Sequence, residues 1–168
     1  MSSVRHDFYT LISTAVAPGT VIHSDHTDAL PARPFIMLGL ELGELGSGQR
    51  APVRATGAGR VSFHRPVSIR LQYFGSGGFD VLDTLQLVLQ NQAMQDLSEQ
   101  LNITALRPVR LQVLSVPLEG GGQEPRAVLD LESGHTAFIE DDVGLIDTVE
   151  VGMNARAGEW VPKIFRAP

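Results

Sequence analysis

Two histidines and two aspartates within six residues form the first group in this sequence that could carry chemistry. They are His23, Asp25, His26 and Asp28. Imidazole and carboxylate groups together can ligate zinc or a similar ion. Their spacing matches neither two ligands on one helix face nor the ligand pair of a hairpin, and the segment is a polar connection. We interpret it as a solvated loop, with a metal site as the alternative.

A glycine-rich sequence, Gly75-Ser76-Gly77-Gly78, is the second candidate, because it precedes a helical pattern. Free backbone N–H groups at the start of a helix can bind phosphate. The sequence lacks the Gly-Lys-Ser/Thr ending of a P-loop and the spacing of a dinucleotide-binding fingerprint. The simpler prediction is a turn between a strand and a helix, in which glycine adopts a positive φ.

Carboxylates cluster near the C-terminus, at Glu140-Asp141-Asp142, with Asp147 and Glu150 following. Such groups can bind magnesium or act as general acid and base. The three consecutive acids fall between two strand patterns, so we predict a solvated charged turn. No Gly-x-Ser-x-Gly nucleophile elbow occurs either. We therefore predict no catalytic, cofactor-binding or metal-binding residue and expect that the protein is not an enzyme.

Composition restricts the classes of protein further. The chain has 168 residues, no cysteine and a net charge of −6. Disulfides, thiolate metal sites and cysteine catalysis are excluded. No apolar run approaches the roughly 18 residues of a membrane span, and the N-terminus lacks the apolar segment of a signal peptide. We expect no membrane association and a cytoplasmic site of folding. The acidic balance also lacks the basic excess of proteins that read DNA sequence.

The elements that must position these groups are predicted from hydrophobic periodicity. An amphipathic helix over residues 4–16 ends at Pro18-Gly19, and we interpret His6 and Asp7 at its start as a capping arrangement. Strands are predicted at 20–23, 35–42, 60–73, 106–116, 125–139 and 144–153, and helices at 78–91 and from about 94 to 102. The order predicts an α+β fold, with a mainly antiparallel or mixed sheet flanked by helices.

Several side chains are assigned to the buried faces of these elements. In strand 60–73 the inward series is Val61, Phe63, Val67, Ile69, Leu71 and Tyr73, and in the helix after it the stripe is Phe79, Leu82, Leu85 and Leu89. Strand 106–116 alternates Val109, Leu111 and Val113 against Arg110 and Gln112. Gly120-Gly121-Gly122 predicts a hairpin between strands 106–116 and 125–139.

Residues 43–59 interrupt the pattern with glycines, Pro52 and almost nothing to bury. We predict a long loop that is either a disordered hairpin tip or a segment that orders against a partner. Pro66 and the inward-phased Arg65 predict an edge position or a bulge in strand 60–73.

The domain prediction is one α+β domain over residues 1–153, followed by a C-terminal tail over residues 154–168. The tail contains the only tryptophan, Trp160. Large apolar residues in a tail must be buried somewhere, so we expect it to dock on its own fold or on a neighbouring subunit.

Taken together, four stretches resemble the neck and tail terminator proteins of tailed phages. They are His6-Asp7-Phe8-Tyr9-Thr10-Leu11-Ile12, Arg33-Pro34-Phe35, Ser68-Ile69-Arg70-Leu71-Gln72-Tyr73-Phe74-Gly75, and Glu124-Pro125-Arg126-Ala127-Val128-Leu129-Asp130-Leu131 with Ile146-Asp147-Thr148-Val149-Glu150-Val151. In order and spacing they cover most of residues 6–152. The loop at 43–59 and the segment after Met153 fall outside the resemblance.

The resemblance implies a tail-terminator-like subunit of a homo-oligomeric ring, typically a hexamer, in the virion neck. Such a ring ends the tail tube and joins it to the head connector, and DNA passes through its lumen without sequence-specific binding. It assembles in the cytoplasm of the bacterial host, and its partners are the tail tube protein and the neck proteins. The family carries no catalytic residues. The alternatives are a head-completion or minor capsid protein, or a small ligand- or metal-binding enzyme domain.

Overall fold

The computed structural model describes residues 3–50, 58–117, 123–142, 148–153 and 161–166. By their internal contacts the residues divide into two units, Met1–Gly48 with Phe63–Ala137, and Gln49–Ser62 with Phe138–Pro168.

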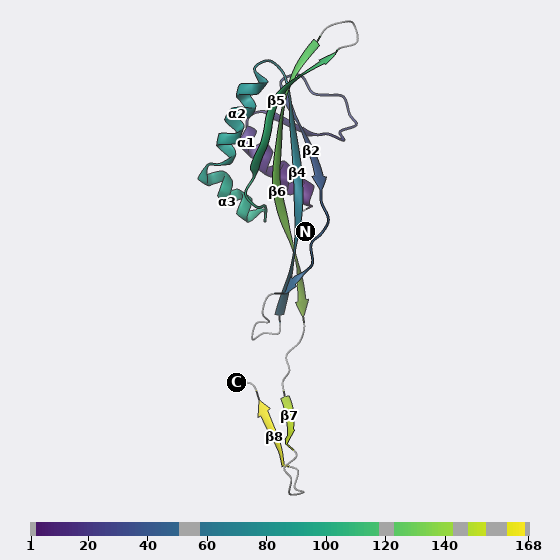
Figure 1. Ribbon diagram of the computed structural model, residues 1–168, viewed down its shortest axis with the longest axis vertical. Coiled ribbons are helices and arrows are strands. Elements are labelled where there is room, and N and C mark those ends of the chain that lie inside the picture. The colour runs from purple at the N-terminus through teal and green to yellow at the C-terminus, as the bar shows by residue number, and fades with distance from the viewer. Residues whose placement is uncertain (1–2, 51–57, 118–122, 143–147, 154–160, 167–168) are drawn as a thin grey trace. The chain divides into compact units, whose positions relative to one another are not determined.

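The elements follow the predicted order of helix, strands, helices and strands (Figure 1). In chain order they are α1 (Val4–Val16), β1 (Thr20–His23), β2 (Phe35–Leu42), β3 (Gln49–Arg50), β4 (Ala58–Phe74), α2 (Gly78–Leu89), α3 (Gln92–Gln100), β5 (Arg107–Pro117), β6 (Gln123–Asp142), β7 (Thr148–Met153) and β8 (Val161–Arg166). The first three predicted elements match the observed bounds, and the helix predicted around 94–102 is α3.

The main sheet is mixed and has six strands in the described residues. Its order is β1-β2-β4-β6-β5, and β3 pairs with β4 beside this path. β1 and β2 are parallel, whereas β2 pairs with β4, and β5 with β6, in antiparallel register. The predicted α+β class with a mixed sheet and flanking helices is therefore confirmed, as is the pairing of β5 with β6.

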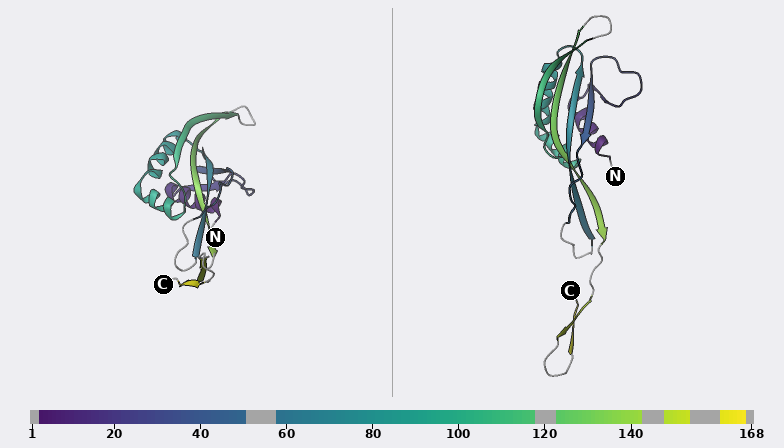
Figure 2. Two further views of the ribbon diagram at one scale, coloured as in Figure 1. Left: turned by 60° about the horizontal axis from the view of Figure 1, so that its bottom comes forward. Right: turned by 45° about the vertical axis from the view of Figure 1, so that its right-hand side comes forward.

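The three helices lie on one face of the main sheet (Figures 1 and 2). Among the described residues, buried side chains of the helices and of that face form one hydrophobic core. From Val67 to Tyr73 the predicted alternation in β4 holds, since Val67, Ile69, Leu71 and Tyr73 are buried and the residues between them are not. Val61 and Phe63, predicted in the same series, are only half-buried. Successive side chains of a strand point to opposite faces of the sheet, so the face away from the core is left for polar residues. The largest fully buried side chains include Phe8, Leu11, Ile12, Ile36, Leu38, Leu82 and Leu129.

The start of α1 differs from the predicted capping arrangement. Ser3 is the N-cap, because its hydroxyl accepts a hydrogen bond from the His6 backbone N–H at 3.2 Å. Asp7 is buried instead of capping the helix. The capping interpretation of His6 and Asp7 was therefore wrong. Ser3 already caps the free backbone N–H group at the start of the helix.

The turn before α2 confirms the simpler interpretation of the glycine-rich sequence. Gly77 has φ +70° and is the N-cap of α2, in a conformation that favours glycine. A Cβ on Gly78 would lie 2.9 Å from the Ala127 Cβ and 2.7 Å from a ring carbon of Tyr73. Positive φ and close packing against β4 and β6 explain these two glycines without a phosphate.

Three residues assigned to the core are exposed. Phe79 is 47% exposed on α2, and Val109 and Val113 in β5 are 56% and 51% exposed. β5 is an edge strand, and its register with β6 shifts between Pro108 and Arg110, at Val109. Periodicity predicted the face of these residues but not whether a neighbouring element covers it.

The segment of residues 43–50 lies alongside β4 and is hydrogen-bonded to it. The Gly43 N–H donates to the Pro66 carbonyl oxygen at 2.9 Å, and the Gly46 N–H donates to that of His64 at 2.8 Å. Gln49 and Arg50 form β3 and pair with Ser62 and Val61. Residues 43–48 have no regular secondary structure, as expected of a loop, whereas Gln49 and Arg50 were not predicted to form a strand; residues 51–57 lie outside the described ranges.

Pro66 does not lie in an edge strand, because β4 runs between β2 and β6. The regular pairing of β2 with β4 ends at Val67 opposite Leu42, next to the proline that cannot donate a hydrogen bond. Arg65 is half-buried, and its Nε is buried without a hydrogen-bond partner.

In the second unit, β7 and β8 form a separate two-stranded antiparallel sheet. Thr148 pairs with Arg166 at one end and Met153 with Val161 at the other. The predicted strand at 144–153 corresponds to β7, with residues 143–147 outside the described ranges. The segment predicted as a tail contains β8, and Trp160 is also outside those ranges.

Candidate functional site

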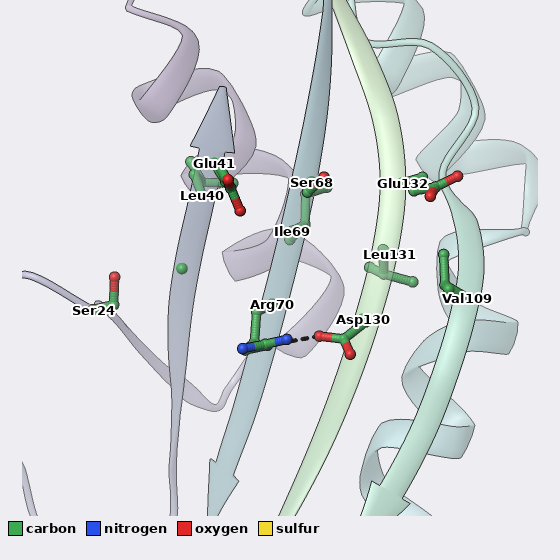
Figure 3. A pocket seen from close by; sticks show the side chains of 11 residues that line it. Ser24, Leu40, Glu41, Ser68, Ile69, Arg70, Val109, Asp130, Leu131 and Glu132 are labelled. Carbon is green, nitrogen blue, oxygen red and sulfur yellow. Dashed lines mark hydrogen bonds and ion pairs between the residues drawn. The ribbon is translucent and has the colours of Figure 1, made fainter. Parts of the chain in front are cut away.

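The outer face of the main sheet, opposite the helices, carries a shallow hollow of about 430 Å³ (Figure 3). Its polar lining comes from four elements or connections of the first unit, at Ser24, Glu41, Ser68, Arg70, Asp130 and Glu132. Arg70 and Ser68 lie on β4, in the phase that alternates with the buried residues. Strand alternation therefore places these polar groups on the face that the helices leave uncovered.

Asp130 is the centre of an ion-pair network on this face. Its Oδ1 accepts a hydrogen bond from the Arg70 Nε at 2.7 Å, and its Oδ2 accepts one from an Arg110 Nη at 3.0 Å. The three residues come from β4, β6 and β5, and Figure 3 shows Arg70 and Asp130 reaching toward each other. The network therefore ties three adjacent strands together.

The pKa of Asp130 reflects two opposing effects. Partial burial alone would raise the pKa of this carboxyl, but the hydrogen bonds and positive charges of Arg70 and Arg110 outweigh burial and lower it. The hydrogen bond and charge of Asp130 in turn raise the pKa of Arg70. Both shifts favour the ionised pair.

A second pair extends the network, because an Arg107 Nη contacts a Glu132 carboxylate oxygen across β5 and β6. These three arginines of the outer face are therefore each paired with a carboxylate. Unneutralised lysine and arginine supply most of the affinity for nucleic-acid phosphates. The arrangement is that of a charge-balanced protein surface rather than a phosphate-binding patch.

Replacing Asp130 by asparagine is expected to destabilise the chain by about 1 kcal/mol at pH 7, the scale of a partly exposed ion-pair network. The folded-state pKa is lowered, so the carboxylate stabilises the fold above the unfolded-state pKa of about 3.9, and this contribution is lost as pH falls through the folded-state value. Urea denaturation of both proteins at pH 7 and pH 3 measures the effect. The difference should shrink at pH 3, and an equal difference at both pH values would contradict the electrostatic origin.

Where β2 begins and β4 ends, a second cluster joins residues of three of the stretches that carry the resemblance. The rings of Phe35 and Phe74 stack with centroids 4.7 Å apart, and the Arg126 guanidinium lies 4.5 Å from the Phe74 centroid. Glu124 is buried and forms ion pairs with Arg126 at 3.2 Å and with Arg33. A buried carboxylate with two guanidinium partners is satisfied electrostatically, so we interpret this cluster as a structural clamp.

Two residues of the His23–Asp28 segment, His23 and Asp25, contact side chains of α1. Asp25 accepts a hydrogen bond from an Arg5 Nη at 2.5 Å, and this bond lowers the pKa of Asp25 despite opposing desolvation. The His23 ring lies 5.1 Å from that of Tyr9, and burial, followed by the charge of Arg5, lowers the pKa of His23. Among the described residues, no group of three histidine, cysteine, aspartate or glutamate side chains is arranged to hold a metal ion.

The carboxylates near the C-terminus are placed differently from the prediction. Glu140, Asp141 and Asp142 are the last residues of β6, so the predicted turn at these positions was wrong. The β ladder with its hydrogen-bonded backbone extends farther than the hydrophobic alternation indicated. Glu150 belongs to β7 and pairs with Ile164, whereas Asp147 is outside the described residues.

A buried pair between α1 and β6 was not predicted from the sequence. The Asp7 Oδ2 lies 3.1 Å from the His135 Nε2, and both side chains are buried. Backbone contacts fix His135, which forms an isolated bridge with Ile103, while the Thr136 N–H donates to the Asn102 carbonyl. The one available signal was that Asp7 lies one helical turn before the buried Leu11, on the apolar stripe.

No protein-family model matches this sequence, and no curated protein matches it with significant similarity. Within the described residues, no helix combines the length and apolar character needed to cross a membrane.

Proposed function

We propose that this chain is a structural virion protein of a tailed phage, a neck or tail terminator. In this proposal, several copies, typically six, form a ring that ends the tail tube and joins it to the head connector. DNA passes through the lumen. The sequence resemblance supports the proposal, and the α+β fold with a mixed sheet is compatible with it.

The observation that carries the proposal is that the described strand residues of the second unit at 49–50 and 59–62 bury no side chain. In the second unit, Gln49 and Arg50 in β3 are exposed, and residues 59–62 of β4 include no buried side chain. Ile139 at the end of β6 is 52% exposed. A ladder of two or three strands without a packed face is marginally stable in water. Such segments are expected in a subunit whose neighbours complete its structure.

The mechanism of a terminator is geometric. Copies joined by one repeated, non-identical pair of surfaces form a closed ring when the rotation between them closes. The net charge of −6 disfavours adhesion to DNA phosphates, which suits a conduit. The paired arginines of the outer face leave this balance intact, because their charges are neutralised by carboxylates.

The proposal is tested by locating the protein in particles of the phage that encodes it. Antibodies raised against the chain should label the head-proximal end of virion tails and of headless tails under the electron microscope. Labelling of DNA-filled, tailless heads instead would support the head-completion alternative. Absence from all three particle types would contradict a structural role in the virion.

A further inference from the structure

We draw no further inference here: the strongest candidate, the apolar groove between α1 and α2 that is lined by Ala15, Val16, Val81 and Val88, carries nothing further because nothing in the part of the chain that the structure describes shows what covers it.

Discussion

Replacing Leu82 by aspartate is expected to abolish cooperative unfolding of the chain. Leu82 is 0% exposed and belongs to the core shared by the helices and the sheet. Removing a buried leucine costs about 2–5 kcal/mol. The introduced carboxyl is buried without a partner, which adds several kcal/mol. The sum is comparable with the 5–15 kcal/mol that stabilises a typical domain. Thermal unfolding followed by circular dichroism measures the loss.

Leu87 provides the matched control on the same helix, since it is 71% exposed. Leu87→Asp should change the free energy of unfolding by no more than about 0.5 kcal/mol, as for most surface substitutions. The two variants introduce the same charge five residues apart, so burial is the main difference between them. If both unfold at the same temperature, the assignment of the α2 core stripe is wrong.

The core of the fold was predictable wherever local periodicity coincided with burial. The alternation of Val67, Ile69 and Leu71 and the helical spacing of Leu82, Leu85 and Leu89 both predicted buried faces, and all six residues are buried. Each pattern identifies one side of its own element. Because the element lies against the centre of the core, that side is covered along its length.

Exposure at the borders of the core was not predictable from the same patterns. Val113 shares a face with the buried Ala127 opposite it, yet it is half exposed because β5 is an edge strand. Phe79 lies next to the helix stripe at the first turn of α2 and faces solvent. Whether another element covers such residues depends on tertiary packing. The periodicity of one helix or strand carries no information about that packing.

The polar sites depend on strand register and could not be assigned beforehand. Arg70 and Asp130 are 60 residues apart and meet because β4 and β6 are adjacent. β8 was missed for a related reason, since its pairing with β7 joins segments whose alternation is interrupted by Pro162 and Lys163. The charged residues could be identified from the sequence, whereas strand order and register determine which of them form ion pairs.

Replacing His135 by alanine is expected to lower the free energy of unfolding by about 3 kcal/mol or more. The substitution leaves the Asp7 carboxyl buried without its side-chain partner, and an orphaned buried polar group costs about 1–3 kcal/mol, or more when charged. Loss of the packed imidazole adds to this cost. Urea denaturation at a fixed pH measures the change. His26→Ala, in an exposed position, is the control and should leave stability nearly unchanged.

A double-mutant cycle separates the Asp7–His135 interaction from the packing of each side chain. Asp7→Ala alone orphans His135, and His135→Ala alone orphans Asp7, whereas the double variant leaves neither polar group buried. The double variant should therefore lose less stability than the sum of the two single losses, with a coupling energy of roughly 0.5–3 kcal/mol. Asp7→Asn should be milder than Asp7→Ala, because the amide can still hydrogen-bond to the imidazole. Additive losses would mean that the 3.1 Å contact contributes nothing beyond packing, and that α1 and β6 are joined by hydrophobic contacts alone.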